Sequence, residues 1–126
     1  MNTTIINTPD APQPLGPYSQ AIAVNGFVFL SGQIALDAQT NQMVGATVAE
    51  QTLQIMKNIS AVLASQALGF SSIVKATVFL RSMAAFAEFN AAYEAALAGH
   101  KPARSTVEVS NLPKNALIEI EVVACR

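Results

Sequence analysis

One arginine and three glutamates stand at alternate positions of two segments near the end of the chain. The first segment carries Arg104, Thr106 and Glu108 at every second position, and the second carries Glu119 and Glu121. Because successive side chains of a strand point to opposite faces, pairing of these two strands would put both polar sets on one face. We therefore expect Arg104 to lie near two carboxylates, on the sheet face opposite the helices.

Two interpretations of this polar face follow from its residue types. In the first, Arg104 holds a planar carboxylate through two parallel hydrogen bonds, and a nearby glutamate positions a water molecule. In the second, the face is solvated and its charges form cross-strand ion pairs that contribute little to stability. The pattern alone favours the second interpretation, and it leaves the first one open.

Three further segments offer residues suited to a binding site. Gly32 follows Ser31 at the end of a predicted strand, where it suits an ordinary strand end or the close approach of a ligand or another backbone. Tyr18 follows a proline-rich lead-in and suits either a lid over the core or the wall of a site. Asn90 lies among aromatic residues, so its amide needs a partner from the backbone or from a substrate.

The other reactive residue types form no known motif. His100 is the single histidine and Cys125 the single cysteine, and they lack the spacing of zinc ligands. Cys125 is expected to be a small buried hydrophobic residue. The chain also has no glycine-rich motif for phosphates or dinucleotides. We therefore expect chemistry without a metal or a cofactor.

The composition limits the class of protein. The chain has 126 residues, which suits a single domain over 1–126, and 52% of the residues are hydrophobic while 12% are charged. A net charge of −1 without a basic stripe argues against nucleic-acid binding. So few charges leave apolar surface for a partner, most simply another copy of the chain. Without a signal peptide or a membrane span, we expect a cytoplasmic protein.

Turn and cap residues divide the chain into short elements. Asn25 and Gly26 separate two apolar runs and predict a β-hairpin. Thr47 and Glu50 have the spacing of a capping box, which predicts the start of a helix, and Gly69 stands where that helix would end. The chain is therefore expected to alternate between strands and two longer helices.

The order of these elements predicts an α+β fold. Strands are expected over 21–24, 27–31, 73–80, 104–109 and 117–125, with a further short one over 4–7, and helices over about 47–69 and 82–99. The strand over 73–80 is expected to bury Val74, Ala76, Val78 and Leu80 on one face. The order β-β-α-β-α-β-β favours a single layer of sheet that carries both helices on one face.

Short segments spread along nearly the whole chain, taken together, are a specific indication of a protein family. In chain order the segments are Gly16-Pro17-Tyr18-Ser19-Gln20, Ser31-Gly32-Gln33-Ile34, Lys75-Ala76-Thr77-Val78-Phe79, Asn90-Ala91-Ala92-Tyr93, Pro102-Ala103-Arg104-Ser105, Leu112-Pro113-Lys114 and Ile118-Glu119-Ile120-Glu121. In this order the series resembles the Rid family, the YjgF-type reactive-intermediate deaminases.

This resemblance implies a fold, an assembly and an activity. The fold would be similar to that of the bacterial chorismate mutase trimer, and three copies would form clefts between neighbouring subunits. The activity would be hydrolysis of 2-imino acids, such as those from 2-aminoacrylate and 2-aminocrotonate, to 2-oxo acids and ammonia. The alternative is a small-molecule-binding or regulatory module that uses the same cleft without turnover. Some relatives are described as ribonucleases, which the net charge of −1 disfavours for this chain.

The resemblance also implies roles for single residues. Arg104 matches the arginine that binds the substrate carboxylate, and Glu119 matches the glutamate associated with the attacking water. The positions that match the lining of the cleft are Tyr18, Ser31, Gly32 and Asn90. Thr106 stands where many active members have cysteine, and its backbone can offer the same polar groups to a substrate. The segment 98–101 is shorter than usual in the family and ends on a lysine where an aromatic residue is frequent.

Overall fold

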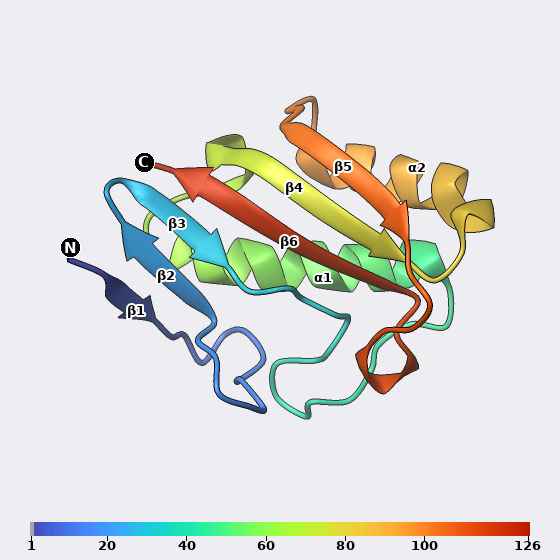
Figure 1. The fold of residues 1–126 in the computed structure, drawn as a ribbon, viewed down its shortest axis with the longest axis horizontal. Helices are drawn as coiled ribbons and strands as arrows, with labels where there is room; N and C mark the ends of the chain where they lie inside the picture. The colour runs from blue at the N-terminus through green and yellow to red at the C-terminus, as the bar shows by residue number, and fades with distance from the viewer. Residues whose placement is uncertain (1) are drawn as a thin grey trace.

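The computed structural model describes residues 2–126 as one six-stranded sheet with two α-helices on one face (Figure 1). The strands are β1 (Thr4–Ile6), β2 (Ala21–Val24), β3 (Phe27–Leu30), β4 (Ile73–Leu80), β5 (Ala103–Glu108) and β6 (Ile118–Cys125). The helices are α1 (Val48–Ala64) and α2 (Phe86–Leu97), and short 3₁₀ turns span Phe70–Ser72, Met83–Ala85 and Pro113–Asn115. The predicted class and element order are confirmed.

The strand order places the last strand of the chain inside the sheet. The order is β1-β2-β3-β6-β4-β5, with β6 antiparallel to both β3 and β4. β5 lies at the edge and runs parallel to β4, because α2 forms the crossover between these two strands. The expected pairing of the two polar strands is therefore wrong, since β4 separates β5 from β6.

Two local signals in the sequence act as expected. Asn25 and Gly26 take positive φ angles of 51° and 82° and join β2 to β3 in a hairpin. At the start of α1, the Thr47 hydroxyl accepts a hydrogen bond from the Glu50 N–H, and the Glu50 carboxylate accepts one from the Thr47 N–H. This capping box fixes the start of α1.

The helix ends differ in detail from the expectation. α1 ends at Ala64 and not near Gly69, because Ala67 takes a left-handed φ of 57° and turns the chain back toward the sheet. Ser82 caps the 3₁₀ turn that leads into α2, and its side chain accepts a hydrogen bond from the Ala84 N–H. α2 ends as expected where Ala98 adopts a left-handed conformation.

The core lies between the sheet and the helices. Its largest fully buried side chains include Ile55, Ile59 and Leu63 of α1, Phe89 of α2, and Ile73, Leu80, Ile118 and Ile120 of the central strands. Val74 was expected in this core, but its side chain is 44% exposed. A bulge between Ile73 and Lys75 shifts the alternation of β4, so that Ile73 takes the buried position.

No helix covers the other face of the sheet in the part of the chain that the structure describes, as the front of the sheet in Figure 1 shows. The large exposed apolar side chains of the strands on this open face include Ile5, Phe27, Phe29 and Val107. Glu119 and Glu121 lie on the same face, opposite Phe79 and Thr77 of β4. Cys125 is partly exposed and not buried as expected, because it follows the same alternation.

Candidate functional site

Arg104 lies on the helix side of the sheet. β5 pairs with β4 so that Arg104 stands beside Ala76, a fully buried core position. Glu108 points to the same side, where its carboxylate accepts a hydrogen bond of 2.8 Å from the Met83 N–H in the turn before α2. The expectation that Arg104 shares a face with the two glutamates of β6 is therefore wrong.

Side chains of α2 hold the guanidinium of Arg104. Asn90 accepts a hydrogen bond of 2.7 Å at Oδ1 from Arg104 Nη1, which supplies the partner that its amide needs. The guanidinium carbon lies 5.6, 5.2 and 5.2 Å from the ring centres of Phe86, Phe89 and Tyr93. Within residues 2–126, Asn90 is the only hydrogen-bond partner of this guanidinium. The Nε–Nη2 edge is thus free for the two parallel hydrogen bonds that a carboxylate accepts.

Arg104 and Asn90 line a cavity of about 330 Å³, which we call the arginine cavity. Its other walls include Tyr93 and Glu94 of α2 and His100 and Lys101 of the segment before β5. The His100 ring is anchored because its Nε2 donates a hydrogen bond of 2.7 Å to the Ile73 carbonyl. The arginine cavity is therefore lined by two cationic side chains, Arg104 and Lys101, together with the Asn90 amide and the Glu94 carboxylate.

Thr106 lies on the same side of β5 as Arg104, two residues further along the strand. It stands beside the buried Val78 of β4. Its hydroxyl is buried and has no hydrogen-bond partner among residues 2–126. Thr106 lines neither the arginine cavity nor the larger cavity on the other face of the sheet.

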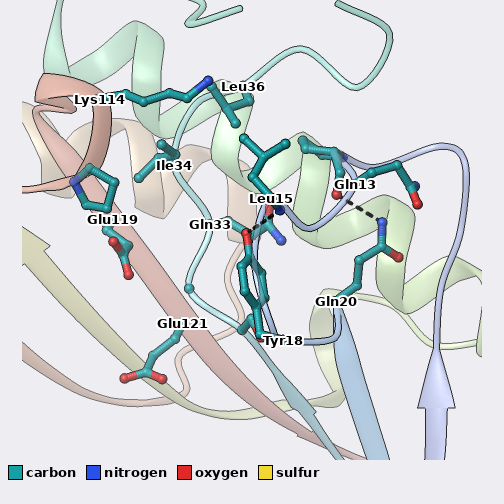
Figure 2. Close-up of a pocket in the computed structure, with 14 residues that line it drawn as sticks. Gln13, Leu15, Tyr18, Gln20, Gln33, Ile34, Leu36, Lys114, Glu119 and Glu121 are labelled. Atoms are coloured by element: carbon teal, nitrogen blue, oxygen red, sulfur yellow. Dashed lines mark hydrogen bonds between the residues drawn. The ribbon is translucent and has the colours of Figure 1, made fainter. Parts of the chain in front are cut away.

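Glu119 lies in this larger cavity, which measures about 630 Å³ and which we call the glutamate cavity. Figure 2 shows Glu119 and Glu121 of β6 on one side of it and Tyr18 of the proline-rich lead-in on the other. The segment that follows β3 completes the wall with Ser31 and Gly32. The expected site residues are thus divided between two cavities, with Tyr18, Ser31, Gly32 and Glu119 in one and Asn90 and Arg104 in the other.

Gly32 allows the carboxylate of Glu119 to lie against the backbone. Beyond β3 the chain stays beside β6, because Gln33 and Ile120 exchange backbone hydrogen bonds of 2.8 and 3.1 Å. A Cβ atom on Gly32 would lie 2.9 Å from Glu119 Cδ and closer still to Oε2. The close approach expected at Gly32 is therefore made by a side chain of the same protein.

The surroundings of Glu119 change its acidity. Burial raises the pKa of the Glu119 carboxyl above its usual value, and the negative charge of Glu121 raises this pKa further. A carboxyl group with a raised pKa holds its proton more strongly and is a better base when it is ionised. Such a shift inside a cavity is typical of a group that exchanges protons during a reaction.

The lead-in forms the far wall of the glutamate cavity. Tyr18 is 53% exposed, and its hydroxyl oxygen lies 3.4 Å from the Leu15 N–H, so this ring is a wall of the cavity and not a lid over the core. Ser31 donates a hydrogen bond of 2.6 Å to the Ser19 carbonyl and ties the end of β3 to the lead-in. These contacts fix the opening of the cavity.

Gln20 and Lys114 are among the residues of this cavity that the sequence did not single out. Gln20 is buried, and its Nε2 lies 3.0, 3.3 and 3.0 Å from the carbonyl oxygens of Thr8, Ala11 and Pro12. This amide holds the lead-in in place, and the signal for it is a glutamine directly before an apolar strand. Lys114 also lines the cavity and takes a left-handed φ of 55°.

Across residues 2–126, no three His, Cys, Asp or Glu side chains are grouped so that they could hold a metal ion. None of the helices in that range combines the length and apolarity needed to cross a bilayer. The described residues thus place an arginine with a free guanidinium edge on one side of the sheet and a carboxyl group with a raised pKa on the other.

Comparison with known proteins assigns the chain to a family. The family model described as endoribonuclease L-PSP matches residues 8–126. A RutC family protein of Synechocystis is 50% identical over 129 residues, which cover 98% of this chain and 97% of that protein. A RutC family protein of Pyrococcus horikoshii is 44% identical over 120 residues, which cover 95% of each chain.

Solved structures agree with this assignment. The Rid family protein YyfA of Yersinia pestis superposes with a TM-score of 0.96 at 44% identity, over 99% of this chain and 100% of that chain. The Escherichia coli protein TdcF, solved with bound serine, superposes with a TM-score of 0.93 at 36% identity over 98% of each chain. By sequence and by fold, the chain belongs to the YjgF/Rid family, whose sequence model carries the description endoribonuclease L-PSP.

Proposed function

We propose that this protein is a cofactor-independent deaminase that hydrolyses 2-imino acids, such as those from 2-aminoacrylate and 2-aminocrotonate, to 2-oxo acids and ammonia. The observation that carries the proposal is the free guanidinium edge of Arg104, because every 2-imino acid has a carboxylate that fits it. The raised pKa of Glu119 supports the proposal, since hydrolysis needs a group that exchanges protons. Cleavage of RNA is not proposed, because a net charge of −1 gives no attraction for a phosphate backbone.

We place the reaction in a cleft between two copies of the chain. Arg104 and Glu119 lie on opposite faces of one sheet, so a single subunit does not present both to one small substrate. The open face also carries exposed apolar side chains, including Ile5 and Phe29, that a second copy would cover. The proposed assembly is the homotrimer that the resemblance implies, in which each cleft takes Arg104 from one subunit and Glu119 from its neighbour.

The chemistry that follows needs only orientation and proton transfer. Arg104 holds the substrate carboxylate, which fixes the adjacent imine carbon in front of a water molecule. Ionised Glu119 takes a proton from this water as its oxygen bonds to the imine carbon, and Glu119 passes that proton to the nitrogen, which gives an intermediate with a hydroxyl and an amino group on one carbon. Glu119 then takes the proton of this hydroxyl as the carbonyl forms and the C–N bond breaks, and it passes this second proton to the leaving nitrogen. One water is consumed, ammonia leaves, and Glu119 returns to its ionised form.

The test generates 2-iminobutanoate in place with a dehydratase and traps it with semicarbazide. We expect a catalytic amount of the protein to reduce semicarbazone formation from the imine, because hydrolysis competes with trapping. Heat-denatured protein serves as the control. If no concentration of the protein accelerates hydrolysis of the imine, the deaminase proposal is wrong.

The second candidate is a small-molecule-binding module without turnover. The relative TdcF was solved with bound serine, which favours ligand binding as a property to test in this chain. Saturable binding of 2-oxobutanoate by calorimetry, without any acceleration of imine loss, would support this candidate over the deaminase.

A further inference from the structure

The arginine cavity is larger and more cationic than one carboxylate requires. Its volume is about 330 Å³, which falls at the lower end of the range for small-molecule sites. Lys101 lines it together with Arg104, so two positive charges face one space. Glu94 is the acidic residue of the lining, and the charges of these three side chains leave an excess of one positive charge.

A buried hydroxyl in the same lining also lacks a partner. Tyr93 is 7% exposed, and its hydroxyl forms no hydrogen bond among residues 2–126. Leaving such a group unpaired destabilises a protein, so a ligand oxygen at this position would be stabilising. Burial also raises the pKa of the Tyr93 hydroxyl, which keeps it protonated and able to donate a hydrogen bond.

We propose that Lys101 is a specificity-determining residue, and that the site accepts 2-imino acids with a second carboxylate at the end of the side chain. This inference rests on the deaminase function proposed above. Arg104 binds the carboxylate next to the imine, and Lys101 attracts the distal one into the arginine cavity. The Tyr93 hydroxyl is the donor that becomes paired when this cavity is filled.

The position of Lys101 suits this role. It lies in the segment that joins α2 to β5, close in the chain to Arg104, and its side chain is exposed in the isolated subunit. The neighbouring His100 is anchored to the carbonyl of Ile73, so the backbone that carries Lys101 is tied to the sheet. A lysine on a fixed segment can select a charged substrate without taking part in the reaction.

The experiment compares two imines produced by amino-acid oxidases, 2-iminoglutarate and 2-iminobutanoate. We expect the wild-type protein to hydrolyse both. Lys101→Gln should lower the ratio of kcat/KM for 2-iminoglutarate to kcat/KM for 2-iminobutanoate at least about fivefold. This is the effect expected from losing a partly solvated charge pair. Glu94→Gln should raise the same ratio, because it removes the opposing charge from the lining. Lys57→Gln, a change of an exposed lysine of α1 that lines neither cavity, is the matched control.

The outcomes separate this inference from the deaminase proposal. If 2-iminobutanoate is hydrolysed and Lys101→Gln leaves the ratio unchanged, the role of Lys101 is wrong and the deaminase proposal stands. If neither imine is hydrolysed, the deaminase proposal fails and the substrate assignment fails with it. A binding measurement gives an independent readout, since Lys101→Gln should weaken binding of 2-oxoglutarate more than that of 2-oxobutanoate. Equal weakening of the two would overturn the inference.

Discussion

The proposed role of Arg104 in binding a carboxylate depends on the shape of its guanidinium as well as on its charge. Three aromatic rings of α2 and the Asn90 amide hold this planar group so that one edge stays free. A lysine ammonium has neither the plane to stack on the rings nor the fork to bind both carboxylate oxygens. The resemblance implied a carboxylate-binding role for Arg104, which stays a prediction, and the structure adds the side chains that would support this role.

Replacement of Arg104 by lysine tests this dependence. Losing a charge-assisted hydrogen bond costs about 1.5–3 kcal/mol, so we expect kcat/KM of Arg104→Lys for 2-iminobutanoate to fall at least about tenfold. Arg81→Lys, a change at a residue that lines neither cavity, is the control. Full activity in Arg104→Lys would leave the arginine with no role beyond surface charge.

Replacement of Glu119 by glutamine tests the proposed proton-exchanging role of this residue through stability as well as activity. The folded-state pKa of Glu119 is raised, so the stability that its protonated form contributes is complete below the unfolded-state pKa and is lost as pH rises through the folded-state value. Glutamine does not ionise, so Glu119→Gln does not lose this stability as the pH rises. We expect its melting temperature to exceed that of the wild type at neutral pH and to match it below about pH 4.

The same variant should lose kcat while it still binds 2-oxobutanoate, because glutamine has a similar shape but cannot accept a proton. Melting curves and calorimetry at several pH values would measure both effects. If Glu119→Gln retains full kcat, a residue other than Glu119 transfers the proton.

Glu121 offers an independent way to shift the acidity of Glu119. Its negative charge raises the pKa of the Glu119 carboxyl, after the larger effect of burial. Glu121→Gln removes that charge, so we expect the acidic limb of the kcat/KM profile to move to lower pH while the maximum rate is kept. Glu108→Gln, on the other face of the sheet, is the control. An unchanged profile in Glu121→Gln would mean that Glu119 does not set this limb.

The elements differ in how far the sequence determines them. The hairpin at Asn25-Gly26 and the capping box of Thr47 and Glu50 depend on neighbouring residues, so their local patterns predict them correctly. The position of β6 between β3 and β4 depends on pairing between distant segments, which a period-two pattern does not specify. The pattern therefore separated the two faces of β5 but did not show that Arg104 faces α2.

The backbone segment after β3 can be tested at Gly32, because a methyl group there would displace the Glu119 carboxylate. We expect Gly32→Ala to fold but to lose at least about tenfold in kcat/KM, since a misplaced group near a reacting atom is costly. Gly69→Ala is the matched control, because a Cβ atom there meets no atom within 4 Å. Activity assays and melting curves of both variants would separate a local displacement from a general loss of stability. Wild-type activity in Gly32→Ala would show that the observed position of Glu119 is not required.

At the scale of the whole molecule, the two cavities explain why a single chain does not form the complete proposed site. The crossover through α2 puts Arg104 on the covered face of the sheet, and the alternation of β6 puts Glu119 on the open face. An assembly in which one subunit covers the open face of the next would hide its exposed apolar side chains and bring the two cavities together. Light scattering at micromolar concentration should then give three times the mass of one chain.

Mixing of two inactive variants tests whether the site is shared. Arg104→Ala subunits keep Glu119, and Glu119→Gln subunits keep Arg104, so the proposed trimer of either variant alone would have no complete cleft. When equal amounts dissociate and reassemble at random, each cleft draws its two groups from different subunits, and about one cleft in four should receive both intact groups. We expect the mixture to recover roughly a quarter of the wild-type kcat/KM, while each variant alone stays inactive. If the arginine and the glutamate acted from the same chain, no combination of these two subunits would restore activity, and the shared cleft would be wrong.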